Sequence, residues 1–244
     1  AERGTLFHDA LEHLIGERSN GPFDAAALER LLAIGAERFA AFADTPEIQA
    51  LWWPRFERMA RWFVAQENDR FDIEDRLVEC TGAMAIGDDF TLTVRADRID
   101  RLRDGRLGIV DYKTGAPPSP KQVLSVSPQL LLEAVIVLAG GFKGVPAGNI
   151  ARLDYYRVSG TGEGGEIKAV GTRKANAKTG EVEITLPQAI ELTLRRVTAL
   201  IAAYGDAEKP YLSRARPAEA MRFAGAYDHL ARVGEWSIGV EDEE

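Results

Sequence analysis

Apolar and polar residues follow a helical rhythm through the first 70 positions of the chain and a two-residue rhythm beyond them. Leu6, Phe7 and Leu11 recur at the three- and four-residue spacing that places side chains on one face of a helix. Spacing of this kind predicts helices over 5–18, 24–43 and 46–68. Alternation of apolar and polar residues then predicts strands over 71–86, 89–102 and 107–113.

The second half of the chain continues as a mixture of helix and strand. The proline-rich segment 115–120 is predicted to be a loop, because proline cannot donate a hydrogen bond to a sheet. Ser127 is predicted to cap a helix whose first residue is Pro128, and Gly140 is typical of a helix end. Further elements are predicted as strands over 150–158 and 166–170, a helix over 187–204, and short helices with an acidic tail over 205–244.

This order of elements predicts an α/β fold. We expect a central mixed sheet that contains an antiparallel meander and is flanked by helices. Within a single domain, 1–70 would form a helical portion, 71–204 the α/β core, and 205–244 a C-terminal extension. The chain does not begin with Met, which fits a piece of a longer polypeptide.

Composition narrows the chemistry that the chain can carry. Cys80 is the only cysteine among 244 residues, which excludes an internal disulfide and a cysteine-ligated zinc or iron–sulfur site within the chain. Lys and Arg total 30 against 38 Asp and Glu, so the formal net charge of −8 argues against a general electrostatic attraction to nucleic acid. No apolar run approaches the length of a membrane span, so no membrane partner is expected.

Acidic residues and a lysine lie on the predicted hairpin between the second and third strands. Asp111 and Lys113 project from the same face of a strand, because successive side chains alternate between faces. Carboxylates are preferred ligands of Mg²⁺ and Mn²⁺. A two-residue hairpin loop would put Asp100 on the face of Asp111, whereas a three-residue loop would put Asp97 directly opposite Asp111. Pattern alone therefore leaves Asp97 and Asp100 as alternatives.

The hairpin and two other segments resemble the RecB-type branch of the PD-(D/E)XK nucleases, and within it the AddB-type nuclease domain of the AddAB helicase–nucleases. The matching residues run from Val94 to Asp100 and from Asp111 to Gly115, where this branch has G-R-I-D-R-I-D followed by D-Y-K-[ST]. His8 resembles the histidine of a G-x-x-x-H segment, and Gln129 resembles the first residue of a Q-x-x-x-Y motif.

Three positions depart from the pattern of this branch. Val94 replaces a glycine, Ala96 replaces an isoleucine, and Glu133 replaces the tyrosine of the last motif. A DNA or phosphate contact by that tyrosine therefore does not carry over to this chain. Members with an iron–sulfur clasp have four cysteines, so the resemblance is to the clasp-free subgroup and no iron–sulfur cluster is expected.

The resemblance implies a restriction-endonuclease-like core and a site that uses Mg²⁺ or Mn²⁺. The metal ligands that it implies are His8, Asp97, Asp111 and the backbone carbonyl of Tyr112. The catalytic residues that it implies are Asp97, Asp111, Lys113 and Gln129. Lys113 would orient or deprotonate the attacking water, and Gln129 would position water or phosphate. Asp100 is then interpreted as the structural partner of a neighbouring arginine, and Arg95 and Arg98 as contacts for DNA phosphates.

The function implied by the resemblance is that of a metal-dependent DNA exonuclease in double-strand break repair. An AddA-like helicase–nuclease subunit would deliver a single strand to the site, in the bacterial cytoplasm at the nucleoid. Delivery by a partner would also explain how so acidic a chain meets DNA. Two alternatives stay open: a stand-alone exonuclease or restriction-type enzyme of the same superfamily, and a catalytically inactive domain that binds DNA or a partner.

Overall fold

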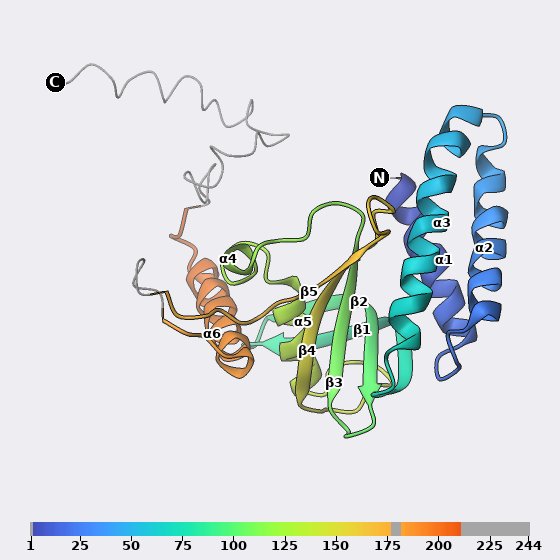
Figure 1. Cartoon of the computed structure of the whole chain (residues 1–244). Coiled ribbons are helices and arrows are strands. Elements are labelled where there is room, and N and C mark those ends of the chain that lie inside the picture. Colours follow the sequence, from blue (N-terminus) through green and yellow to red (C-terminus); the bar gives the residue numbers. More distant parts are fainter. Residues whose placement is uncertain (1, 177–181, 211–244) are drawn as a thin grey trace, which may run out of the picture. The chain divides into compact units, whose positions relative to one another are not determined.

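A computed structural model describes residues 2–176 and 182–210 of the chain (Figure 1). Its internal contacts divide the chain into two units, Ala1–Ala199 and Leu200–Glu244. Of the second unit, only 200–210 are described, and they include the C-terminal end of the last helix. The short helices predicted over 205–244 therefore fall almost wholly outside the described residues.

Three helices of the N-terminal portion match the predicted ones closely. They are α1 (Glu2–Glu17), α2 (Ala25–Phe39) and α3 (Pro46–Asn68), with a 3₁₀ turn η1 (Ala40–Phe42) after α2. Asp24 caps α2, because its side chain accepts a hydrogen bond from the backbone N of Ala27 at 3.1 Å. Gly35 lets α2 and α3 approach closely, since a Cβ at this position would lie 2.1 Å from the Phe56 ring.

Within the described residues, five strands form one sheet in the order β1-β2-β3-β4-β5. Their bounds are β1 (Ile73–Ile86), β2 (Phe90–Leu102), β3 (Leu107–Lys113), β4 (Ile150–Arg157) and β5 (Glu166–Ala169). The first three strands form an antiparallel meander, β4 runs parallel to β3, and β5 is antiparallel to β4. The predicted mixed sheet with an antiparallel meander is therefore confirmed.

Helices fill the crossover that the parallel β3–β4 pair requires. They are α4 (Pro120–Val123) and α5 (Gln129–Leu138), and α6 (Leu186–Gly205) follows the sheet. The short α4 was not predicted; Ser119 and Gln122 form a capping box at its start. The prediction that Ser127 caps the next helix was wrong, because Pro128 occupies the cap position of α5 and no side chain caps it. No described helix is long and apolar enough to cross a membrane.

The sheet separates two hydrophobic cores, with α1, α2 and α3 on one face and α5 with the first turns of α6 on the other (Figure 1). Val110 and Tyr112 of β3 belong to the core under the N-terminal helices, whereas Ile109 belongs to the core under α5. Because side chains alternate along a strand, Asp111 and Lys113 lie on the α5 side. The fold thus brings the two charged residues of β3 next to the start of α5.

Candidate active site

The β2–β3 hairpin has the three-residue loop, which sets the relation between the two candidate acids. Arg98 pairs with Val110 at the open end of the ladder. The next residues outward are Asp97 and Asp111, so this register places them opposite each other. Gly105, the last residue of the loop, has φ 81°, the left-handed conformation typical of this kind of hairpin closure. Of the two registers that the sequence left open, the structure has the one with Asp97 beside Asp111.

Asp97 is the point at which α1 meets the hairpin. Its Oδ2 accepts a hydrogen bond from the backbone N of Tyr112 at 2.9 Å. The same oxygen lies 3.7 Å from Nδ1 of His8, which α1 carries. The rings of His8 and Tyr112 also meet edge to face, with their centroids 5.7 Å apart. The structure therefore brings His8 and Asp97 together, as the sequence predicted.

A second hydrogen-bonded group joins the end of β3 to the start of α5. The Nζ of Lys113 donates to Oδ1 of Asp111 at 2.9 Å and to Oε1 of Gln129 at 3.3 Å. The Nε2 of Gln129 donates to the same Asp111 oxygen at 2.6 Å. Gln129 is the first residue of α5, so the start of this helix fixes where its amide lies. Three of the four side chains predicted to be catalytic thus contact one another.

Asp111 is the buried acid of this group. Its residue is 2% exposed, and burial raises the pKa of its carboxyl; Lys113 opposes the rise, and Asp97 adds to it. Its Oδ2 lies 2.7 Å from Nζ of Lys113, but the direction of that contact does not make a hydrogen bond. Among the described residues this oxygen has no hydrogen-bond partner, and its nearest positive charge is the ammonium of Lys113. A carboxylate oxygen in this position can accept a cation as a ligand.

The side chains in this region include the types of ligand that a hard divalent cation prefers, but they are not arranged as a preformed metal site. In the described part of the chain, no group of three or more His, Cys, Asp or Glu side chains is arranged to hold a metal ion. Asp97 and His8 are nevertheless adjacent, and Asp111 presents an oxygen without an aligned hydrogen bond. Carboxylate oxygens are the ligands that Mg²⁺ and Mn²⁺ prefer, and histidine is a common metal ligand in general. By their chemistry, these residues fit the ion that the family resemblance implies.

His8, Asp97 and Lys113 line an open cavity of about 530 Å³. The cavity is also lined by acidic residues that no motif indicated, namely Asp9, Glu12 and Glu79. Glu79 lies on β1 between residues that pair with the two neighbours of Asp97 in β2. Its φ of 53° is uncommon for a residue other than glycine. Sequence reasoning missed Glu79 because its place beside Asp97 depends on the β1–β2 register, which alternation alone does not specify.

Glu133 is a second buried carboxyl group beside the predicted residues. It lies on α5, is 1% exposed, and accepts a hydrogen bond at Oε1 from Nε2 of Gln129 at 3.2 Å. Burial raises the pKa of Glu133 to about 8; Gln129 opposes the rise, and Asp111 adds to it. In the sequence, the only signal for this position was its departure from the tyrosine of the family pattern.

The two arginines predicted to contact DNA have different surroundings. Arg98 is fully buried and donates hydrogen bonds to both Glu67 and Asp100. The prediction that it contacts DNA phosphates was therefore wrong, because its guanidinium is enclosed within the protein. The interpretation of Asp100 as the structural partner of an arginine is confirmed. Arg95 lines the cavity, forms an ion pair with Glu79 and has a side chain that is 66% exposed, so its contact with DNA stays a prediction.

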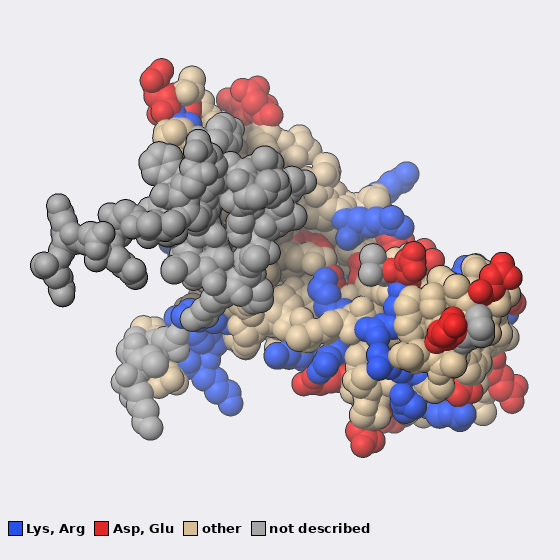
Figure 2. Space-filling view, turned by 90° about the horizontal axis from the view of Figure 1, so that it is seen from above, with Lys and Arg blue, Asp and Glu red and all other residues tan. Residues whose placement is uncertain are grey.

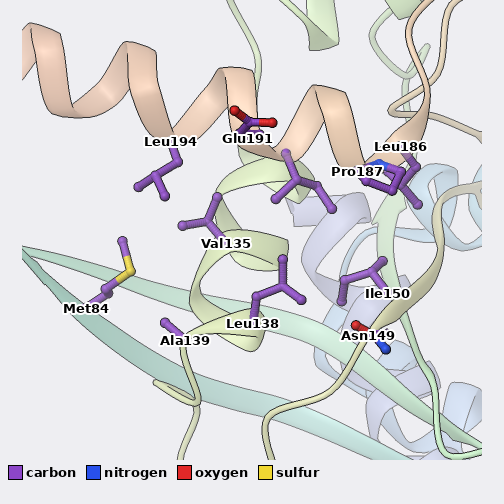
Figure 3. A pocket seen from close by; sticks show the side chains of 11 residues that line it. Met84, Val135, Leu138, Ala139, Asn149, Ile150, Leu186, Pro187, Glu191 and Leu194 are labelled. Carbon is purple, nitrogen blue, oxygen red and sulfur yellow. The ribbon is translucent and has the colours of Figure 1, made fainter.

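A second cavity, of about 590 Å³, lies where α5 and α6 face each other (Figure 3). Its wall is mainly apolar and includes Met84, Val135, Leu138, Leu186 and Leu194. Glu191 is the only acidic or basic residue among those described along this wall. The cavity at Asp97, with its acids and lysine, is therefore the better candidate for chemistry.

Comparison with known proteins gives one family and several partial relatives. A family model described as the PD-(D/E)XK nuclease superfamily matches residues 1–230. An uncharacterized protein of Rickettsia conorii is 40% identical over 58 residues, which cover 23% of this chain and 7% of that protein. An uncharacterized protein of Rickettsia felis is 37% identical over 82 residues, which cover 30% of this chain and 10% of the relative. A third, an uncharacterized protein of Rickettsia typhi, is 29% identical over 102 residues, which cover 38% of this chain and 11% of the relative. The matched segments thus span only about a tenth of these relatives.

Proposed function

Because the chain belongs to the PD-(D/E)XK nuclease superfamily, we propose that it hydrolyses phosphodiester bonds in DNA with the help of Mg²⁺ or Mn²⁺. One observation carries this proposal. At the open end of the β2–β3 hairpin, the adjacent His8 and Asp97 lie beside the hydrogen-bonded Asp111 and Lys113. Neither group alone would be specific, since pairs of oppositely charged side chains are common in folded proteins. Acids, an imidazole and a lysine beside one cavity are a combination suited to phosphate chemistry.

In the proposed reaction, water attacks the phosphorus atom and the bond to the leaving oxygen breaks. A divalent ion held by His8, Asp97, Asp111 and the carbonyl oxygen of Tyr112 would act as a Lewis acid and lower the pKa of the water. Lys113 lies against Asp111 and would orient the water and offset the negative charge that grows on the phosphate. Gln129 would hold the lysine and the acid in their relative positions.

The charges around the cavity bear on how DNA reaches the site. Arg95 and Lys113 are its basic side chains among the described residues, and they lie among four acidic ones, Asp9, Glu12, Glu79 and Asp97. In the view of Figure 2, basic and acidic side chains are interspersed over the visible described surface. Such a surface supplies little general attraction to a polyanion.

We therefore propose, as the finer function, an exonuclease that trims DNA ends in double-strand break repair within a helicase–nuclease complex. An AddA-like subunit that feeds in a single strand would supply the affinity that this surface lacks. On this proposal, the protein works in the bacterial cytoplasm at the nucleoid. Cutting of an end-labelled duplex that is stimulated by such a subunit and ATP would support the assignment, and indifference to the subunit would favour a stand-alone nuclease.

The test of the proposed chemistry is cleavage of a labelled single-stranded oligonucleotide with Mg²⁺, with and without EDTA. Asp111→Ala and Lys113→Ala should each lower the rate by at least about a hundredfold, the scale for losing a group that stabilises the transition state. Asp88→Ala, which removes an exposed carboxylate in the β1–β2 turn, is the matched control and should keep its activity. Thermal unfolding of each variant shows that it has folded.

Two outcomes would count against the proposed chemistry. Cutting that survives both Asp111→Ala and Lys113→Ala would locate the reaction elsewhere in the chain. Binding of DNA without cutting, by a folded wild-type protein supplied with Mg²⁺ and Mn²⁺, would favour the alternative of an inactive domain that binds DNA or a partner.

A further inference from the structure

We propose that Glu133 is a positioning residue of this site, which holds the amide of Gln129 in the orientation that serves both Asp111 and Lys113. The inference rests on the proposed function, because that function is what gives Gln129 and Lys113 their roles. Glu133 lies four residues after Gln129, one turn further along α5, and only 1% of it is exposed.

Three charged or acidic side chains surround the amide of Gln129. Its Nε2 donates to Oδ1 of Asp111 at 2.6 Å and to Oε1 of Glu133 at 3.2 Å. Its Oε1 accepts from Nζ of Lys113 at 3.3 Å. An amide nitrogen carries two hydrogens, so each hydrogen has its own acceptor and the amide oxygen has a donor. Glu133 is the acceptor for the second hydrogen.

Rotation of this amide by half a turn would exchange its oxygen and nitrogen. The oxygen of Gln129 would then face the carboxyl oxygens of Asp111 and Glu133, and its NH₂ group would face the ammonium of Lys113. Every one of the three hydrogen bonds would be lost in that orientation. Asp111 and Lys113 thus oppose the rotated orientation, and Glu133 gives the second amide hydrogen of Gln129 a fixed acceptor in place of water, although Gln129 itself is exposed.

A carboxyl group is otherwise unfavourable at this position of α5. The neighbouring positions Leu130, Ala134 and Val137 are buried and apolar, and Oε2 of Glu133 has no hydrogen-bond partner among the described residues. Because burial raises the pKa of Glu133 to about 8, the group is largely a neutral acid near pH 7. A neutral acid keeps the carbonyl oxygen that accepts from Gln129. The positioning thus needs an acceptor rather than a charge, and glutamine can supply one.

The first experiment follows the Gln129 side-chain amide in the full chain without metal, independently of activity. Its two NH₂ proton signals in ¹⁵N–¹H spectra are assigned by their loss in Gln129→Ala. Glu133→Met should move one proton signal upfield and speed its exchange with water by about tenfold, because that hydrogen loses its acceptor. Glu133→Gln should preserve both signals. Ile136→Met places a methionine at a buried apolar position of the same helix and should leave the Gln129 signals unchanged.

The second experiment measures cleavage of the labelled oligonucleotide by the same variants. Glu133→Met should lower kcat about ten- to hundredfold, the range found when a residue supporting a functional side chain is lost, with little change in KM. Glu133→Gln should stay within about threefold of wild type, since its amide oxygen replaces the acceptor. In a Gln129→Ala background, Glu133→Met should have no further effect, because it acts through Gln129.

These measurements separate failure of the inference from failure of the proposed function. Unchanged Gln129 NH₂ signals in Glu133→Met would overturn the positioning role whether or not the protein cuts DNA. Rate losses that multiply in the Gln129→Ala, Glu133→Met double variant would also overturn it. A wild-type protein that cuts no DNA while its NH₂ signals respond as expected would instead refute the nuclease and leave the positioning of Gln129 supported.

Discussion

Replacement of the buried Arg98 by alanine gives the sharpest test of how β2 is held in this fold. The guanidinium of Arg98 donates to Glu67 at 2.8 and 2.9 Å and to Asp100 at 2.5 and 3.0 Å, and all three side chains have 0% exposure. Loss of one partner of a buried ion pair costs about 3–5 kcal/mol, because it leaves an uncompensated charge. Here Glu67 would keep Arg76 at 2.7 Å, and Asp100 would keep Arg152 at 3.4 Å. We therefore expect the lower end of this range, about 3 kcal/mol.

The free energy of unfolding is measured by urea titration, followed by tryptophan fluorescence. Arg101→Ala is the matched control, because Arg101 lies on the same strand but its side chain is 40% exposed and pairs with the exposed Glu74. An exposed pair of this kind contributes at most about 1 kcal/mol. Equal losses for Arg98→Ala and Arg101→Ala would refute the reasoning from burial. An Arg98→Ala protein that is as stable as wild type but binds DNA poorly would also refute this reasoning. That result would indicate that Arg98 contacts DNA and does not stabilise the fold.

Two further predictions concern charged residues. Burial alone would raise the pKa of Glu67, but Arg98 and Arg76 outweigh burial and hold it below its ordinary value of 4.5. The folded state then binds this proton more weakly than the unfolded chain, so the contribution is present above about pH 4.5 and is lost as the pH falls below that value. Urea titrations at about pH 6 and about pH 3.5 should show wild type losing more stability than Glu67→Gln, and equal losses would count against this cause. Arg95→Ala should raise KM for DNA several-fold with kcat and stability nearly unchanged, because its exposed side chain lines the cavity; an unchanged KM in steady-state cleavage would exclude the contact.

Local pattern predicted most of the fold, because each element carries its own signal. Alternation over 107–113 matched β3 to the residue, and helical spacing over 46–68 matched α3. Gly105 allowed a three-residue hairpin loop as one of two possibilities. Its φ of 81° is the left-handed conformation that the last residue of such a loop adopts. The register, however, is a property of two strands together. The alternation of either strand is compatible with both registers, so sequence pattern alone did not decide between Asp97 and Asp100.

The side chains that were misjudged depend on partners far away in the sequence. Arg98 lies in an alternating run and looks like any exposed basic residue until Glu67, 31 positions earlier, is seen to meet it. Glu133 stands in an apolar helix, and its partner Gln129 matters only because Asp111 of β3 lies on the other side of the amide. In both cases the decisive contact joins a helix to a strand, and neither helical nor strand periodicity contains that information.

In the hairpin, residues with structural contacts alternate with the candidate site residues. Tyr112 shows this most clearly, because its hydroxyl accepts from the buried Arg98 at 3.3 Å on one face while its backbone N donates to Asp97 at 2.9 Å. Arg98 is also the covalent neighbour of Asp97, as Tyr112 is of Asp111. The buried ion pairs of Arg98 with Glu67 and Asp100 therefore fix the backbone that carries both acids. Because this restraint comes from contacts of the fold itself, the cost of bringing the two acids together is met during folding, which leaves more of the binding energy for the reaction.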